Sequence, residues 1–121
     1  YGSPTSTALI SKVIKCLIKD YLSQNFWEKG IYHLTPNGKT SWFEIAKFVI
    51  NLANQSDFNV NFPLNNLNCI TSDKYPSLAK RPSNSLLNNK KLDEKLFFDL
   101  PNWEDDIKEL FPLILKSKSH E

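Results

Sequence analysis

One stretch of the sequence gathers side chains suited to binding a small anionic molecule. It reads Arg81-Pro82-Ser83-Asn84-Ser85. The planar guanidinium of Arg81 can hold an anionic group through two parallel hydrogen bonds, and Pro82 stiffens the loop that presents it. Asn84 and Ser85 can add neutral hydrogen-bond donors. The alternative is that Arg81 pairs with a carboxylate of the protein and that the loop only packs between two lobes.

A second candidate for ligand contact lies at the start of the sequence. Gly2, Pro4 and Thr5 precede the first predicted helix. A glycine permits, and a proline fixes, a close approach of the backbone to a ligand, so these residues could line a cleft. The alternative is a simple start of a helix in which Thr5 is the cap.

Residues that hold metals or act as nucleophiles are few and scattered. Cys16 and Cys69 have no metal-ligand spacing and stand among apolar residues, so we expect two buried thiols in a reducing compartment. His33 falls within a predicted strand, where a single histidine is usually a hydrogen-bonded core residue. His120 lies in the polar tail. No metal site is predicted.

Two long amphipathic segments are expected to position the candidate residues. Apolar residues recur at helical spacing over residues 9–22, after three residues that could cap a helix, 5–7. Ser41 and Glu44 have the spacing of a capping box. This predicts a second helix over residues 42–54, which is apolar almost all round and therefore expected to be mostly buried.

Shorter elements follow from local signals. Residues 31–34 are rich in strand formers, and residues 36–38 read as a turn. Asn88 or Asn89 could cap a short helix that runs through Leu96.

The last predicted helix begins at Pro101-Asn102. The acids of its first turn suit the positive end of its dipole, and a later proline should kink it or thin its final turn. Trp42 and Trp103 stand on apolar stripes at helix starts, so core positions are expected for both. The acids and the proline are Glu104, Asp105, Asp106 and Pro112.

Composition limits the function classes. The chain has 121 residues, of which 40% are hydrophobic and 23% charged, with a formal net charge of +2. Such a composition is globular, and the charge is too small and too evenly distributed to indicate nucleic-acid binding. No apolar run approaches the length of a membrane span. A cytoplasmic protein without a membrane or nucleic-acid partner is therefore expected.

The sequence contains no methionine. Tyr1 is therefore not expected to be a translation start, and we expect a cropped or processed fragment.

Four segments, in order, resemble the dTDP-4-dehydrorhamnose reductase family, and together they cover nearly the whole chain. They match its Gly-x-Pro-Thr segment, its Gly-x-Tyr-His-Leu strand followed by Ser/Thr-Trp, its Tyr-Pro and Arg-Pro-x-Asn-Ser segment with a following leucine, and its Leu-Pro-x-Trp helix. The corresponding residues here are 1–5, 30–42, 75–92 and 100–103.

The resemblance implies an α/β fold, mostly helical with a few short strands. It implies the C-terminal substrate-binding lobe of an extended short-chain dehydrogenase whose N-terminal Rossmann domain is not in this sequence. Residues 1–40 would then include a helix and a strand that join the Rossmann sheet, residues 41–115 would form the substrate lobe, and residues 116–121 a frayed tail.

The same resemblance implies a reaction and its partners. The family reduces dTDP-4-dehydro-L-rhamnose to dTDP-L-rhamnose for surface polysaccharide, with NADPH or NADH bound by the N-terminal domain and a Tyr-x-x-x-Lys pair handling the proton. Neither this pair nor a glycine-rich dinucleotide loop occurs here. We therefore expect an inactive fragment without a cofactor, in which the dTDP-sugar contacts are Arg81, Asn84, Ser85, Gly2, Pro4 and Thr5.

Other functions stay open at the level of sequence. The chain could belong to another sugar-nucleotide reductase or epimerase, to a non-catalytic subunit of the same superfamily, or to a helical interaction domain. A lobe without its partner would expose the edge of the 31–34 strand and neighbouring apolar helix faces. Self-association of the isolated chain is therefore predicted, with strand pairing as one route.

Overall fold

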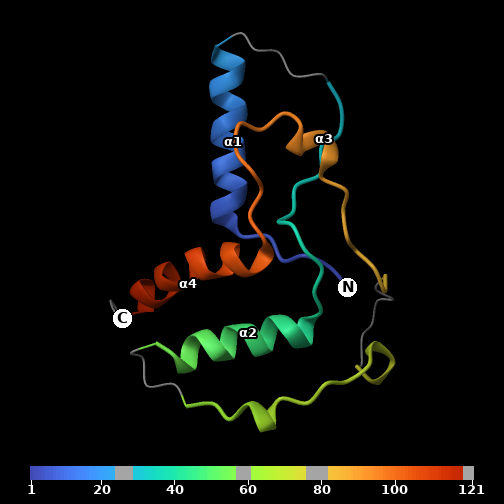
Figure 1. Ribbon diagram of the computed structural model, residues 1–121, viewed down its shortest axis with the longest axis vertical. Coiled ribbons are helices and arrows are strands. Elements are labelled where there is room, and N and C mark those ends of the chain that lie inside the picture. The colour runs from blue at the N-terminus through green and yellow to red at the C-terminus, as the bar shows by residue number, and fades with distance from the viewer. Residues whose placement is uncertain (24–28, 57–60, 76–81, 119–121) are drawn as a thin grey trace. The chain divides into compact units, whose positions relative to one another are not determined.

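The computed structural model describes residues 1–23, 29–56, 61–75 and 82–118. The chain forms two compact units, each built from segments that are distant in the sequence. Unit 1 comprises Tyr1–Gly2 and Lys39–Leu86, and unit 2 comprises Ser3–Gly38 and Leu87–Glu121. Figure 1 shows their elements.

Unit 2 begins with helix α1 (Thr7–Leu22), as the apolar spacing predicts. Ser6 is its N-cap, and the Ser6 hydroxyl accepts a hydrogen bond of 3.0 Å from the Leu9 amide. This bond satisfies one of the amides that the first turn leaves without a partner.

The core of unit 2 lies along one side of α1. Leu9 and Val13 pack there with Leu92 and Leu100. The segment after α3 (Lys90–Asp93) runs back beside α1 toward α4 and brings Leu100 to this core (Figure 1). Five half-buried residues pack around these four: Leu17, Tyr32, Leu34, Leu96 and Phe98.

The predicted strand over residues 31–34 is wrong. Within the described ranges the structure has no strand, and the only β-pairs are two isolated bridges, Gly2 with Thr40 and Asn37 with Asn102. A strand needs a neighbour to receive its hydrogen bonds, and residues 31–34 form no bridge with another described segment. Tyr32 and Leu34 still reach the core, whereas His33 is exposed, so the expectation of a core histidine is also wrong.

Asn37 fixes the start of α4 (Trp103–Lys118). Its amide donates to the carbonyl of Pro101 (2.8 Å), its carbonyl accepts from the amide of Trp103 (3.0 Å), and its side-chain nitrogen donates to the carbonyl of Leu100 (2.7 Å). Trp103 is buried, as predicted. The helix continues past Pro112 to Lys118.

Asn89 closes unit 2 between two loops. Its side-chain oxygen accepts from the amide (3.1 Å) and hydroxyl (3.2 Å) of Thr35, and its side-chain nitrogen donates to the carbonyl (2.6 Å) and hydroxyl oxygen (3.0 Å) of the same residue. Asn89 stands at the cap position of α3 but forms no cap bond, since its side chain is engaged with Thr35. The helix ends at Asp93 and does not reach Leu96 as predicted.

Unit 1 is organised by α2 (Trp42–Asn54), whose bounds agree with the prediction. Ser41 is its N-cap and accepts from the Glu44 amide at 3.2 Å. The expected burial of α2 is wrong, because none of its residues is buried and the side chain of Trp42 is 79% exposed. Although α2 is apolar on almost every side, other segments do not cover it on every side.

The rest of unit 1 is mostly irregular. Two single turns of 3-10 helix, η1 (Leu64–Asn66) and η2 (Ser72–Lys74), interrupt a segment that runs back alongside α2 (Figure 1). The Asn54 side chain ties the end of α2 to this segment by donating to the Phe62 carbonyl (3.0 Å) and accepting from its amide (3.1 Å).

The helical part of the predicted fold class is confirmed, and its short strands are wrong for the described residues. Both cysteines are free thiols, but Cys16 is only half-buried and Cys69 is exposed, so their predicted burial is wrong. None of the described helices is long and apolar enough to cross a membrane.

Candidate functional site

Residues 83–85 are bound to the first residue of the chain. The backbone nitrogen of Tyr1 donates to the carbonyl of Ser83 at 2.7 Å. In return, the carbonyl of Tyr1 accepts from the amide of Ser85 at 2.8 Å and from its hydroxyl at 3.1 Å. Three hydrogen bonds thus fix the backbone of a predicted site segment against Tyr1.

The next residue, Gly2, pairs with Thr40. The two residues exchange backbone hydrogen bonds of 3.0 and 2.9 Å in an antiparallel bridge. A Cβ atom on Gly2 would lie 2.9 Å from the hydroxyl oxygen of Ser85, so Gly2 and the Ser85 side chain approach each other closely. Within unit 1, segments 1–2, 39–41 and 83–85 therefore form one cluster, which we call the Tyr1 cluster.

The predicted site residues are divided between the two units. Gly2, Asn84 and Ser85 belong to unit 1, whereas Pro4 and Thr5 belong to unit 2. Arg81, the main sequence candidate, lies outside the described residues.

Asn84 and Ser85 are both exposed, but both also form local hydrogen bonds. The side-chain oxygen of Asn84 accepts from the Leu86 amide at 3.1 Å, which leaves the donor end of the amide out of this bond. The Ser85 hydroxyl donates to the protein itself, at Tyr1. Both side chains therefore make hydrogen bonds within the protein that stabilise the local conformation of this segment.

At the start of α1, the cap is Ser6 and not Thr5. The Thr5 hydroxyl makes only a long contact of 3.5 Å with the Ser3 carbonyl. The Ser6 amide and hydroxyl instead donate to the two carboxylate oxygens of Asp106, at 2.8 and 2.6 Å. The sequence assigned Asp106 to the helix dipole and gave no sign of this partner.

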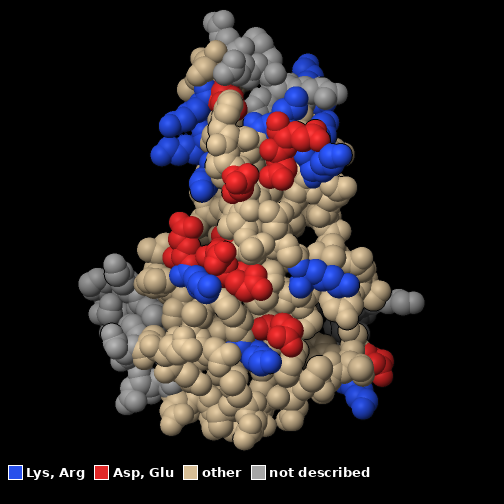
Figure 2. Space-filling model, in the orientation of Figure 1, with Lys and Arg blue, Asp and Glu red and all other residues tan. Residues whose placement is uncertain are grey.

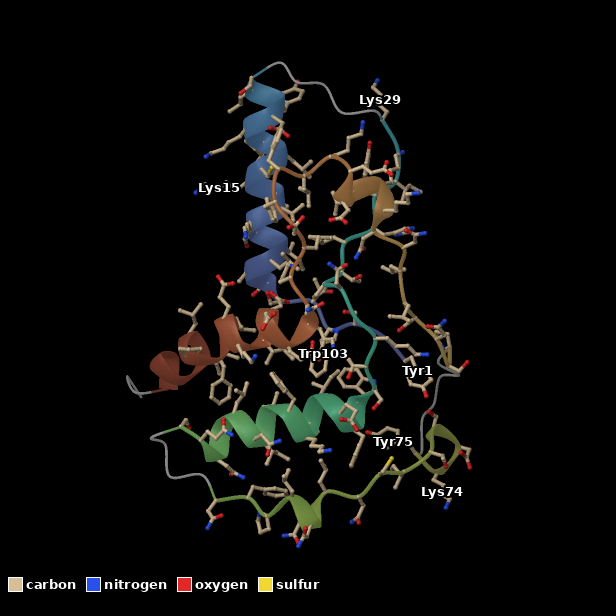
Figure 3. The ribbon with its side chains drawn as sticks, in the orientation of Figure 1. Tyr1, Lys15, Lys29, Lys74, Tyr75 and Trp103 are labelled. Carbon is tan, nitrogen blue, oxygen red and sulfur yellow. The ribbon has the colours of Figure 1, made fainter. Side chains whose placement is uncertain are left out.

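Sequence reasoning also missed Tyr1 and Lys39. The Tyr1 side chain is 64% exposed, and the Lys39 ammonium lies 3.8 Å from the centre of its ring. Tyr1, which belongs to unit 1, is labelled in Figure 3. Because Gly2 pairs with Thr40, Tyr1 and Lys39 are diagonal neighbours on one face of the bridge, within reach of a long side chain. The sequence signal for this contact is weak, since the two residues are far apart in the chain.

The charges of the described residues are sparse and mixed. On the face in Figure 2, lysine side chains are interspersed with aspartate and glutamate side chains. Among the residues with described side chains, the one ion pair is the exposed Lys108 with Asp105, at 3.3 Å. In unit 1, hydrogen bonds from the Thr71 side chain and from the backbone amide of Asp73 lower the pKa of the Asp73 carboxyl.

No group of three His, Cys, Asp or Glu side chains that could hold a metal ion occurs in the described part of the chain. The Tyr1 cluster presents an exposed aromatic ring, an ammonium group, and the backbone and side-chain groups of residues 83–85.

Comparisons with known proteins agree with one another. Residues 1–115 match the model of the family described as "RmlD substrate binding domain". Curated proteins named dTDP-4-dehydrorhamnose reductase are similar to the chain. The protein from Shigella flexneri is 32% identical over 111 residues, which are 91% of this chain and 36% of that protein. The protein from Sinorhizobium fredii is 32% identical over 119 residues, which are 97% of this chain and 39% of that protein.

The relative from Escherichia coli (strain K12) is 31% identical over 110 residues, or 91% of this chain and 36% of the relative. The chain thus spans a little over a third of the length of these curated relatives. No solved structure matches it.

Proposed function

The chain belongs to the RmlD substrate binding domain family, and on that basis we propose that it is the C-terminal, substrate-side part of a dTDP-4-dehydrorhamnose reductase. The observation that carries this proposal is the match of residues 1–115 to the family. The names of the similar curated proteins point to the same enzyme.

The complete enzyme would reduce the 4-keto group of dTDP-4-dehydro-L-rhamnose to give dTDP-L-rhamnose. NADPH or NADH would supply the hydride from an N-terminal domain outside this chain. The residues present here do not fit a dinucleotide, since the three glycines, Gly2, Gly30 and Gly38, are too far apart for a phosphate-binding loop. No tyrosine is followed four residues later by a lysine, so we expect no reductase activity from the chain alone.

The contribution of this chain is to bind and orient the dTDP-sugar. Arg81, Asn84 and Ser85 are the proposed contacts on one loop, and Gly2, Pro4 and Thr5 the proposed contacts before α1. Support comes from unit 1, where three hydrogen bonds to Tyr1 fix residues 83–85 and Gly2 lies against Ser85. A backbone fixed before the ligand arrives lowers the entropy lost on binding.

A fusion enzyme tests the proposal. The chain would replace the matching segment of the Escherichia coli relative, and NADPH oxidation would be followed with dTDP-4-dehydro-L-rhamnose. We expect oxidation by the fusion and none by the remaining E. coli portion alone. Arg81→Ala should weaken dTDP binding by about 1.5–3 kcal/mol, the range for a hydrogen bond to a charged group. A folded, soluble fusion that oxidises no NADPH would contradict the reductase assignment and favour a non-catalytic module.

We also propose that the isolated chain self-associates, through α1 and not through a strand. Since residues 31–34 form no strand, they offer no basis for strand pairing. The side of α1 away from the unit 2 core carries a series of exposed apolar side chains, and such surfaces usually mark contacts. They are Ile10, Ile14, Ile18, Tyr21 and Leu22.

A further inference from the structure

The Tyr1 cluster carries one positively charged side chain among its described residues. Segments 1–2, 39–41 and 83–85 contain no Asp, Glu or Arg, and their one lysine is Lys39. The Lys39 side chain is exposed, and its described neighbour is the aromatic ring of Tyr1, not a carboxylate. Its charge is therefore not neutralised by any described acidic group.

The Tyr1 ring gives this lysine a defined place. An ammonium group 3.8 Å from a ring centre is within the range of a cation–π interaction. The ring is held at its base, because the Tyr1 backbone is bonded to residues 83–85 on one side and Gly2 is paired with Thr40 on the other. A lysine ammonium has three N–H donors, and the ring face offers them no oxygen acceptor. The N–H groups that point away from the ring can therefore donate to an anion.

We propose that Lys39 is a phosphate-binding residue for the diphosphate of a sugar nucleotide, positioned by the ring of Tyr1 beside residues 83–85. The inference rests on the proposed function for the identity of the ligand. It adds a cation from the segment that leads into α2, which sequence reasoning did not assign to the site. An ammonium acts on phosphate oxygens as a point charge, so Lys39 can attract either phosphate of a diphosphate.

The test is an NMR titration of the ¹⁵N-labelled chain, which needs no fusion. The probes are dTDP, inorganic pyrophosphate, and thymidine, which lacks phosphate. We expect dTDP and pyrophosphate to shift the amide signals of Lys39, Thr40 and Ser85 in a saturable way, and thymidine to leave them unchanged. Equal shifts with thymidine would overturn the phosphate assignment.

Variants separate charge from position. Lys39→Gln should weaken dTDP binding about 10-fold, as expected for the loss of a hydrogen bond to a charged group. Lys39→Arg, which keeps the charge, should stay within about 3-fold of the unmodified chain. Tyr1→Leu should weaken binding about 2- to 5-fold, the range of an exposed cation–π contact. Lys47→Gln, a change of an exposed lysine on α2 in the same unit, is the matched control and should have no effect.

The outcomes distinguish this inference from the proposed function. If Lys39→Gln bound dTDP as tightly as the unmodified chain, the role of Lys39 would be overturned. The same would follow if dTDP shifted only other amide signals. Either result would leave the reductase assignment intact. No response of any amide to dTDP would also overturn the role of Lys39, and the fusion assay would then decide the reductase assignment separately.

Discussion

Asp106 and Ser6 are 100 residues apart in the sequence and share two short hydrogen bonds. The carboxylate of Asp106, in the first turn of α4, accepts from the Ser6 amide at 2.8 Å and from its hydroxyl at 2.6 Å. Both residues are buried, with 4% and 7% of Asp106 and Ser6 exposed. Since Ser6 also caps α1, one carboxylate joins the beginnings of two helices.

The first prediction concerns this carboxylate. Asp106→Ala would leave the Ser6 amide buried without its acceptor, so the free energy of unfolding should fall by about 1.5–3 kcal/mol. Urea unfolding followed by circular dichroism measures the change. Asp105→Ala is the control, because Asp105 is exposed and pairs only with Lys108, and an exposed pair contributes at most about 1 kcal/mol. Equal effects of the two substitutions would show that the bonds to Ser6 contribute nothing.

The second prediction concerns Asn89, whose side chain makes four hydrogen bonds to Thr35. Asn89→Asp replaces the donor nitrogen by an acceptor, which sets a carboxylate oxygen against the Thr35 carbonyl. We expect the free energy of unfolding, measured by urea denaturation, to fall by about 1–3 kcal/mol. The neighbouring exposed Asn88, whose side chain only accepts from the Lys90 amide, supplies the control Asn88→Asp, which should be nearly neutral. If Asn89→Asp left the stability unchanged, the hydrogen bonds between Asn89 and Thr35 would not stabilise the fold.

The third prediction concerns the turn at Gly38. Its φ of +95° is unfavourable for other residues, and a Cβ atom there would lie 2.9 Å from Cδ1 of Trp103. Gly38→Ala should therefore cost about 1–3 kcal/mol, measured by thermal unfolding. Gly38→Asn tests the cause, since asparagine tolerates positive φ better but carries the same Cβ. If the crowding against Trp103 dominates, Asn should be no better than Ala, and a stable Gly38→Ala would show that neither effect operates.

Local signals in the sequence were sufficient for the long helices. Ser41 and Glu44 identified the start of α2, and the apolar spacing identified α1, because capping and helical periodicity involve residues within one or two turns. Burial could not be derived in the same way. Trp42 was expected in the core and is 79% exposed, since burial depends on which other segment packs against a helix face.

The candidate site was predictable only in part. The local motifs pointed to Gly2, Asn84 and Ser85, which the structure brings into one unit. The contact of Lys39 with Tyr1 depends on the pairing of Gly2 with Thr40, and no local pattern specifies that pairing. The strand expected at residues 31–34 failed for a related reason, because strand-forming residues do not provide a partner strand.

The fourth prediction concerns the outer side of α1, where Ile14 and Ile18 are 49% and 54% exposed. These residues are four apart and form a ridge with their apolar neighbours on the same face. We expect the isolated chain to sediment as a dimer or larger species at high concentration. Ile14→Lys combined with Ile18→Lys should shift it to a monomer, because charged side chains do not bury against a second copy.

The control is Ile70→Lys, which changes an isoleucine of similar exposure, 55%, in an irregular segment of unit 1. It should leave the sedimentation behaviour unchanged. Circular dichroism of the double variant should match that of the unmodified chain, since the replaced side chains lie outside the unit 2 core. If the unmodified chain were a monomer at high concentration, by sedimentation and by light scattering, the proposed self-association would be contradicted.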